Sequence, residues 1–180
     1  PDGQTIAYDG HIYGSDSGSQ PLDPTLFTGL DGEERCALYN PSWSPDGRQM
    51  AWLCGGESGS RLIVFDMVRQ TAMILFTWQP AQFGALPPSP VWSSDGKWVA
   101  VEIWANNNYE NGLWVLPADG TMVRVHLPTG HDPLWLNATQ LIYADKDENM
   151  NGNTKLYDLD FGAVGVLELP ATGQVLLPSY

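Results

Sequence analysis

Positive charge is scarce in this chain of 180 residues. It carries 8 Lys and Arg against 21 Asp and Glu, which gives a formal net charge of −13 at pH 7. A protein this acidic repels the phosphate backbone of nucleic acids and the surface of anionic membranes, so we expect neither as a partner. Apolar runs are also short, and none approaches the roughly 20 residues that a membrane-spanning helix needs. We therefore expect no membrane insertion.

Histidine is rare, and the residue patterns of common catalytic sites are missing. The three histidines, His11, His126 and His131, show no zinc-binding spacing. No serine lies in a nucleophile-elbow motif, and no pair of carboxylates stands out for acid–base chemistry, because many aspartates belong to turns. The sequence thus favours a protein that is not an enzyme, with histidines that are structural or face solvent.

Only two cysteines are present, Cys36 and Cys54. The turn at Pro45-Asp46-Gly47 lies between the two cysteines in sequence. If Ser44 pairs with Arg48 across this turn, the register places Leu38 opposite Cys54. Cys36 then lies two residues further out, close enough for a disulfide if the strand end bends. Two buried free thiols are the alternative. Both suit an extracytoplasmic protein, but only the disulfide would argue for that location.

Glycine, proline and apolar residues are plentiful by contrast. The 19 glycines and 14 prolines are spread along the chain, which indicates many turns rather than one disordered linker. Apolar residues make up 43% of the chain, enough for one sizeable core. Because no helical periodicity of useful length occurs, we predict a single all-β domain.

One hairpin pattern recurs along the chain. Residues 41–52 read PSWSPDGRQMAW, in which Pro-Asp-Gly is a turn between two short strands. Residues 90–101, PVWSSDGKWVAV, repeat it, and residues 133–144, PLWLNATQLIYA, are a weaker copy. The chain begins with PDGQTIAYDG, the second half of the same hairpin. The turns are about 44, 49 and 42 residues apart, the spacing of β-propeller blades.

Each repeat also contains two further strand-like runs. The third runs are residues 11–13, 62–66, 113–116 and 155–158, and the fourth, outer runs are residues 25–27, 72–76, 122–126 and 164–169. Four short strands per repeat, repeated radially, predict a β-propeller of four four-stranded blades. The repeats span approximately residues 1–36 (completed by 174–180), 37–86, 87–130 and 131–173.

The repeat resembles that of TolB-like β-propellers. The resemblance rests on P-x-W-S-P-D-G-x-x-(I/M/V)-A followed by an I-Y/V-x-x-D strand, and it covers essentially the whole chain. It is strong around Trp43 and Trp92, partial at the N-terminus and degenerate at Trp135. Such propellers serve as protein-interaction platforms, as gates on peptidases and as parts of polysaccharide lyases, so the resemblance implies a fold more than a function.

The two ends of the chain complement each other. Residues 174–180 read QVLLPSY, which matches the first strand of the intact repeat and stops one residue short of the turn. We expect this strand to complete the N-terminal blade, because closure hides a sheet edge. It can close its own chain, complete a neighbouring copy in a larger ring or filament, or begin a fifth blade if the chain is part of a longer propeller.

A calcium loop is the sharpest chemical signal. Residues 147–158, DENMNGNTKLYD, place oxygen ligands at alternate positions and a glycine at the sixth, as EF-hand-like and dockerin-type loops do. The predicted ligands are the side chains of Asp147, Asn149, Asn151 and Asp158 and the backbone carbonyl of Asn153. Asp145 is an extra ligand, or replaces Asp158 if the strand carries that side chain away. The alternative is a polar turn that collects such residues without metal.

The longest connection between strands carries two aromatic residues. Trp78 and Phe83 lie among several prolines, which is compatible with a recognition surface for a protein partner or a glycan. The alternative is a loop packed over its own blade. The repeat-position tryptophans, Trp43, Trp92 and Trp135, are read instead as packing between blades.

These observations predict a non-catalytic propeller module that is extracytoplasmic (periplasmic, cell-surface or secreted). We expect it to bind a protein partner or further copies of itself through residues 174–180, and to carry a structural Ca²⁺. The alternatives are an enzyme-associated propeller, either lyase-like or the gating domain of a hydrolase, and a carbohydrate-binding propeller.

Overall fold

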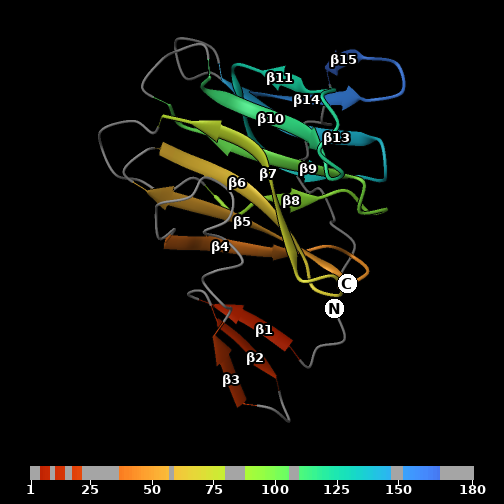
Figure 1. The fold of residues 1–180 in the computed structure, drawn as a ribbon. Helices are drawn as coiled ribbons and strands as arrows, with labels where there is room; N and C mark the ends of the chain where they lie inside the picture. The colour runs from red at the N-terminus through yellow and green to blue at the C-terminus, as the bar shows by residue number, and fades with distance from the viewer. Residues whose placement is uncertain are drawn as a thin grey trace.

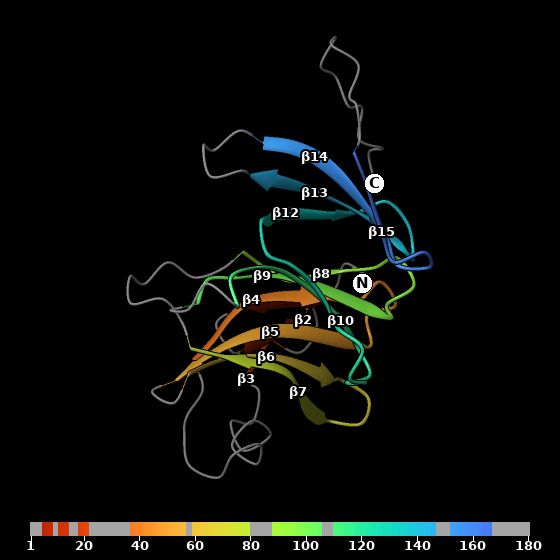
Figure 2. The same ribbon diagram turned by 90° about the horizontal axis from the view of Figure 1, so that it is seen from above.

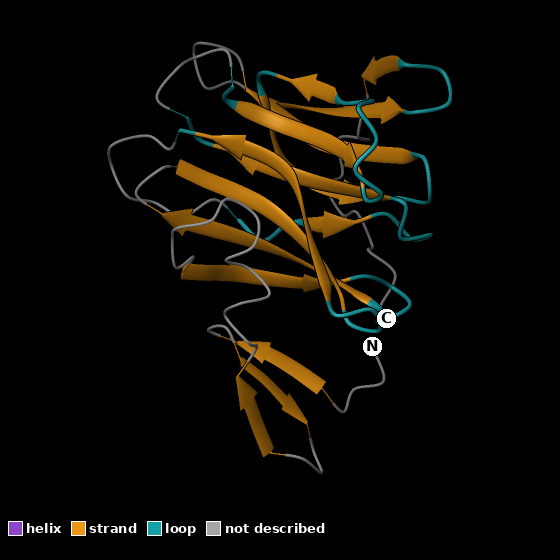
Figure 3. Ribbon diagram, viewed as in Figure 1, coloured by secondary structure: helices purple, strands orange, loops and turns teal. Residues whose placement is uncertain are grey.

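The computed structural model describes residues 5–8, 11–14, 18–21, 37–56, 59–79, 88–105, 110–146 and 152–166. All regular structure within these ranges is β-strand, and no described residue is helical (Figure 3). This confirms the predicted all-β class.

The strands form four antiparallel sheets. The first sheet contains β1 (Thr5–Tyr8), β2 (His11–Gly14) and β3 (Gly18–Pro21). The second contains β4 (Ala37–Trp43), β5 (Gln49–Gly56), β6 (Gly59–Asp66) and β7 (Thr71–Trp78). The third contains β8 (Val91–Trp92), β9 (Trp98–Ile103), β10 (Gly112–Pro117) and β11 (Val125–Leu127). The fourth contains β12 (Gly130–Trp135), β13 (Gln140–Lys146), β14 (Gly152–Asp158) and β15 (Ala163–Val166).

Each sheet is a meander in which neighbours in sequence are neighbours in space. The sheets follow one another in chain order, as Figures 1 and 2 show from two directions. This is the blade arrangement of a β-propeller. The fourth sheet begins at Gly130, one residue before the predicted repeat boundary.

The first blade differs from the prediction in its outer strand. We placed that strand at residues 25–27, but β3 occupies the position seven residues earlier, at Gly18–Pro21. Residues 25–27 and the predicted closing strand, residues 174–180, lie outside the described residues.

A bulge shifts the register of the innermost strand. Trp43 pairs with Met50. The register here therefore differs by one position from the predicted one, in which Ser44 pairs with Arg48. The shift is undone before Leu38, which does lie opposite Cys54. Asn40 lies in the shifted segment and has φ of 51°, a left-handed conformation that asparagine tolerates. The innermost strand of the fourth blade has the same irregularity. Its register shifts next to Asp132, which also has φ of 51°.

The turn that follows is built around a buried serine. The backbone N–H of Ser44 donates to the carbonyl of Gln49, and the N–H of Gly47 donates to the carbonyl of Ser44. The Ser44 hydroxyl lies 2.7 Å from Oδ1 of Asp46 and accepts the N–H of Gln49 at 2.9 Å. Gly47 adopts φ of 70°, which explains why glycine occupies this position.

The third blade contains the same turn. The Ser93 hydroxyl donates to Oδ1 of Asp95 at 2.7 Å and accepts the N–H of Trp98 at 3.0 Å. Gly96 has φ of 71°. In the degenerate fourth repeat, Asn137 replaces this arrangement by accepting the backbone N–H groups of Thr139 and Gln140. The aspartate of the repeat therefore belongs to a turn, as predicted, and the structure adds the buried serine hydroxyl as its partner.

The repeat-position tryptophans join consecutive blades. Nε1 of Trp92 donates to the carbonyl of Ser42 at 2.9 Å, and Nε1 of Trp135 donates to the carbonyl of Val91 at 3.1 Å. Both side chains are buried, at 8% and 9% exposure. The acceptor is in each case the residue before the tryptophan position of the preceding blade. This confirms that Trp92 and Trp135 pack between blades.

Candidate functional site

The propeller has two ends that differ in chemistry. The turn end carries the turns at residues 44–49 and 93–98, together with the β6–β7 and β10–β11 connections. The loop end is the opposite one, where β5, β9 and β13 finish and β12 and β14 begin. Of the residues singled out from the sequence, Asp145, Asn153 and Trp78 lie at the loop end.

The predicted calcium residues do not all gather at one place. Asp145 and Asn153 face each other in the register of β13 and β14, at the loop end. Asp158 lies at the other end of β14, opposite Gln140, whose Nε2 donates to Oδ2 of Asp158 at 2.8 Å. Strand β14 thus places Asp158 away from Asn153 and the loop end. Under this condition we expected Asp145 to replace Asp158 as a calcium ligand. Asp147, Asn149 and Asn151 lie outside the described residues.

Asp145 already has hydrogen-bonding partners at this end. Lys155 forms an ion pair with its carboxylate, and the Thr129 hydroxyl donates to Oδ1. Burial pulls the pKa of Asp145 upward, but these hydrogen bonds and the Lys155 charge outweigh it, so the pKa lies below its ordinary value. Among the described residues, no group of three or more His, Cys, Asp or Glu side chains could hold a metal ion.

Trp78 is not a surface residue. It is the last residue of β7 and is 3% exposed, within the core cluster shared by the second and third blades. Its ring lies 6.3 Å from that of Phe76. The prediction that Trp78 presents a recognition surface is therefore wrong, because strand alternation points it inward while Thr77 is exposed. Phe83 lies outside the described residues.

Cys54 lies in β5, is 2% exposed and is disulfide-bonded. Its predicted partner, Cys36, lies outside the described residues. The pairing of Cys36 with Cys54 stays a prediction.

A buried carboxylate at the loop end links the third blade to the fourth. Glu102 in β9 is 5% exposed, and its Oε1 lies 2.9 Å from Nδ1 of His131 in β12. The same oxygen accepts Nε1 of Trp104 at 2.6 Å, while Oε2 accepts the N–H of Asp132 at 3.3 Å. Sequence reasoning missed this cluster. Glu102 and His131 are 29 residues apart, and no local pattern relates them.

His126 has a structural environment, as predicted. Its ring stacks on that of Trp114, with centroids 4.1 Å apart and planes inclined by 13°. Its Nε2 lies 2.8 Å from the carbonyl of Asn111.

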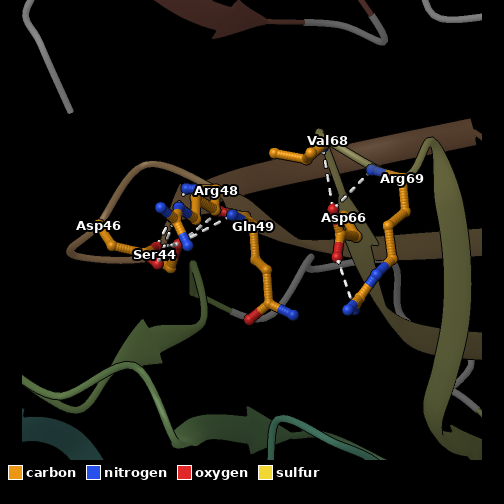
Figure 4. Close-up of polar contacts among 7 residues, drawn as sticks. All are labelled: Ser44, Asp46, Arg48, Gln49, Asp66, Val68 and Arg69. Carbon is orange, nitrogen blue, oxygen red and sulfur yellow. Dashed lines mark hydrogen bonds and ion pairs between the residues drawn. The ribbon is translucent and has the colours of Figure 1, made fainter.

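The turn end presents an ordered set of charged side chains (Figure 4). Oδ1 of Asp66 accepts the N–H groups of Val68 and Arg69, each at 2.9 Å, and Oδ2 lies 3.3 Å from Nη1 of Arg69. These contacts, the Arg69 amide first, hold the pKa of Asp66 below its ordinary value. The Arg48 backbone N–H donates to Asp46 in the same way at 3.0 Å.

Two hollows open beside these charges. One, the arginine hollow, has a volume of about 340 Å³ and is lined by Arg48, Asp66, Val68 and Arg69. The other, the interblade groove, has a volume of about 350 Å³ and lies between the second and third blades. Its lining residues are Gln49, Gly96, Lys97, Trp98, Pro117, Ala118, Asp119, Thr121 and Val123.

Solved structures share this architecture. TolB from Acinetobacter baumannii superposes with a TM-score of 0.55 at 18% identity, over 88% of this chain and 37% of that one. The β-propeller domain of the Trilobed protease from Pyrococcus furiosus, which has an open velcro topology, superposes at 0.60 and 11% identity, over 88% and 48%. The chain has a TolB-like β-propeller fold.

Peptidases with such a propeller are also among its structural neighbours. A puromycin-hydrolysing peptidase of Mycobacterium tuberculosis superposes with a TM-score of 0.61 at 18% identity, over 92% of this chain and 29% of that one. This TolB-like propeller therefore spans between 29% and 48% of the length of these three chains. At the level of sequence, no family model and no curated protein matches it.

The described part of the TolB-like propeller contains no helix long and apolar enough to cross a membrane.

Proposed function

We propose that this chain is a non-catalytic, extracytoplasmic TolB-like propeller module that binds a protein partner or further copies of itself. The observation that carries the proposal is the pair of adjacent hollows at the turn end, one apolar and one lined by arginine. A concave surface that combines apolar walls with a few charged groups is suited to recognising another protein.

The contacts of the buried repeat serines and of two histidines support a non-catalytic role. The Ser44 and Ser93 hydroxyls are used inside turns and are 1% and 0% exposed, so neither is placed as a nucleophile. His126 stacks on Trp114, and His131 contacts Glu102 rather than a serine or cysteine. A fluorophosphonate probe, which labels activated serines, should leave the purified chain unlabelled. Stoichiometric labelling would refute this part of the proposal.

The disulfide-bonded state of Cys54 supports an extracytoplasmic location, because disulfides persist in oxidising compartments. Non-reducing mass analysis of the native protein, isolated with free thiols blocked, should find no free thiol at Cys54. A Cys54 that is fully modified by the blocking reagent would count against this location.

We further propose that the loop around Asp145 and Asn153 binds one structural Ca²⁺. The two residues are paired in register, and carboxylate and amide oxygens suit this cation. The Lys155 ammonium competes with the ion for Asp145, so binding requires that the ion displaces it. Asp158 is not part of the proposed site.

Native mass spectrometry with and without a chelator tests metal and assembly together. The proposal predicts one Ca²⁺ per chain that the chelator removes, and either a discrete oligomer or a monomer closed by residues 174–180. A mass unaffected by the chelator would refute the calcium site. Deleting residues 174–180 should lower the melting temperature in the closed and exchanged forms, and an unchanged melting temperature would favour the fifth-blade reading.

A second candidate is the propeller of a hydrolase, which the peptidase neighbours favour. In that case the chain would be one part of a longer enzyme and would gate access to an active site elsewhere. The full-length coding sequence distinguishes the two: a hydrolase domain in the same polypeptide would support the second candidate.

A further inference from the structure

One face of the fourth blade is partly exposed. Leu141 and Tyr143 of β13 point towards the third blade and are 0% and 4% exposed, within the core cluster that the two blades share. Ile142, between them, points the opposite way and is only partly buried. Figures 1 and 2 both show the fourth blade at one end of the described blades. We call the face that carries Ile142, with its cross-strand neighbours Leu134 and Leu156, the end face.

The same face is buried in the two preceding blades. Directly paired residues form one row across it in each sheet: Ser42, Ala51, Val64 and Met73 in the second blade, Val91, Ala100, Val115 and Val125 in the third, and Leu134, Ile142, Leu156 and Gly165 in the fourth. The two middle residues of the second-blade and third-blade rows are at most 2% exposed. In the fourth row, Leu134 is 40% exposed, and a Cβ on Gly165 would meet nothing within 4 Å. The end face thus occupies a position that is an interface in the other two blades.

In both of those interfaces, the repeat-position tryptophan of the next blade covers the row. Trp92 shares a core cluster with residues of the second-blade row, and Trp135 shares one with residues of the third-blade row. Each indole N–H also donates to the carbonyl of the row's first residue, which is Ser42 for Trp92 and Val91 for Trp135. In the fourth row the first residue is Leu134. An occupant that continues the series therefore brings an aromatic ring with a hydrogen-bond donor to Leu134.

Residues 174–180 continue this series in the sequence. The row's first residue and the tryptophan that follows it lie in Pro41-Ser42-Trp43, Pro90-Val91-Trp92 and Pro133-Leu134-Trp135, and the next copy of this pattern is Pro178-Ser179-Tyr180. Tyrosine supplies an O–H donor in place of the indole N–H. Its ring is smaller than that of tryptophan, and the fourth row presents Ile142 where the other two rows present alanine. The larger residue in the row thus compensates for the smaller ring.

The chain reaches the end face from β15 without a long connection. Strand β15 is antiparallel to β14, so it leads back to the loop end, where the innermost strand β12 also begins. Residues 79–90 join the outermost strand of the second blade to the innermost strand of the third, and residues 128–129 do the same between the third and fourth. Residues 167–173 are intermediate in length between these connections. At about 3.3–3.6 Å per extended residue, they exceed the three strand spacings of a blade, about 14 Å.

We propose that residues 174–180 lie as an extended strand on the end face of the fourth blade of their own chain, with the Tyr180 ring over Leu134, Ile142 and Leu156. The inference rests on the role proposed for residues 174–180 as an innermost strand, and it names the surface that receives them. A strand held by its own chain is not available to complete a neighbouring copy. A protein partner then binds elsewhere on the propeller, as at the turn end.

Photo-cross-linking tests this contact directly. The full chain carries p-benzoylphenylalanine in place of Tyr180, and a mixture of chains with natural and with heavy nitrogen is irradiated and digested. Mass spectrometry should find cross-links from this residue to β12, β13 or β14, each between peptides of the same isotope. Cross-links only to other parts of the chain would overturn the inference. Cross-links that join the two isotopes would show that the strand comes from a second copy, which overturns it as well.

Nitration of the native chain gives a readout that needs no substitution. Tetranitromethane should modify Tyr180 at least about tenfold more slowly than it modifies the free peptide QVLLPSY, because a packed ring reacts only after local opening. Tyr143 is buried against the third blade, so it should stay unmodified and reports that the fourth blade remains folded. Equal nitration rates for Tyr180 and the free peptide would contradict the inference.

Matched variants locate the contact on one face of the sheet. Leu134→Asp should raise the nitration rate of Tyr180 by about fivefold or more, because it places a charge beneath the ring. Val164→Asp is the control, since Val164 is 50% exposed but lies in the row of Leu141, on the opposite side of the sheet. This variant should leave the Tyr180 rate within about twofold of the wild type. Equal rates in the two variants would count against the end face as the surface under Tyr180.

The outcomes separate this inference from the proposed function. A freely reactive Tyr180 would overturn the inference and leave protein binding and the calcium loop as proposed. Cross-links between copies would overturn it and support self-assembly. Labelling by the fluorophosphonate probe would refute the non-catalytic function wherever Tyr180 lies.

Discussion

Nε1 of Trp92 lies 2.9 Å from the carbonyl oxygen of Ser42, and this hydrogen bond joins the innermost strands of the second and third blades. The equivalent bond from Trp135 to Val91 joins the third blade to the fourth. The repeat-position tryptophan thus fills the space between blades and also satisfies a backbone carbonyl of the preceding blade.

Replacing Trp92 by phenylalanine keeps an aromatic ring but removes the donor. We expect a loss of about 1 kcal/mol in the free energy of unfolding beyond the effect of the smaller ring, because the Ser42 carbonyl loses its partner. Urea unfolding measures this. Trp98→Phe is the control, since the Trp98 indole donates no hydrogen bond within the described residues. An equal loss in both variants would contradict the prediction.

Ser93→Ala should destabilise the turn of the third blade by about 1–3 kcal/mol. The substitution leaves the Trp98 N–H and a carboxylate oxygen of Asp95 without the hydroxyl, and Ser93 is 0% exposed. Ser94→Ala is the matched control, because Ser94 is the next residue and is exposed. Thermal unfolding should separate the two variants clearly, and a Ser93→Ala protein as stable as Ser94→Ala would count against the role of the hydroxyl.

Acid should destabilise the propeller through its turn aspartates. Burial would raise the pKa of Asp95, but hydrogen bonds from Ser93 and Lys97 outweigh it and hold the pKa below its ordinary value. The unfolded state therefore binds more protons, and stability present above about pH 4 is lost as pH falls through the lower folded pKa. Urea midpoints between pH 7 and pH 2.5 measure this. Asp95→Asn, which keeps the acceptor but cannot ionise, should show a smaller drop below pH 4.

Glu102→Gln tests the link between the third and fourth blades. Glutamine cannot accept at both side-chain positions, so either the Trp104 indole N–H or the Asp132 N–H loses its acceptor. We expect a loss of about 1–3 kcal/mol in the free energy of unfolding. Asp160→Asn, on the exposed turn after β14, should stay within about 0.5 kcal/mol of the wild type. A silent Glu102→Gln would show that the cluster is dispensable for stability.

Gly112→Ala should be among the more damaging glycine substitutions. Gly112 has φ of 109°, and a Cβ there would lie 2.6 Å from the Leu127 carbonyl oxygen, with the Pro128 carbonyl also in the way. We expect a loss of more than about 2 kcal/mol. Gly165→Ala is the control, because its Cβ would meet nothing within 4 Å. Similar melting temperatures for both variants would contradict the steric argument.

The sequence by itself determined the all-β class, the repeating hairpin, and the turns at Ser44 and Ser93. These features depend on residues a few positions apart, whose conformational preferences act locally. The repeat also predicted that Trp92 and Trp135 pack between blades, since a large aromatic at one fixed position of each blade meets the same neighbour.

Only the tertiary structure decided which distant residues meet. The contact of Glu102 with His131 depends on how two sheets pack. The distance between Asn153 and Asp158 depends on β14 being an extended strand, which places them near opposite ends. Trp78 was predicted to lie in a loop because prolines follow it closely in the sequence. Strand β7 instead continues to Trp78, whose side chain is buried. The interblade groove arises in the same way, because Gln49 of the second blade meets the turns of the third blade only when the two sheets pack side by side.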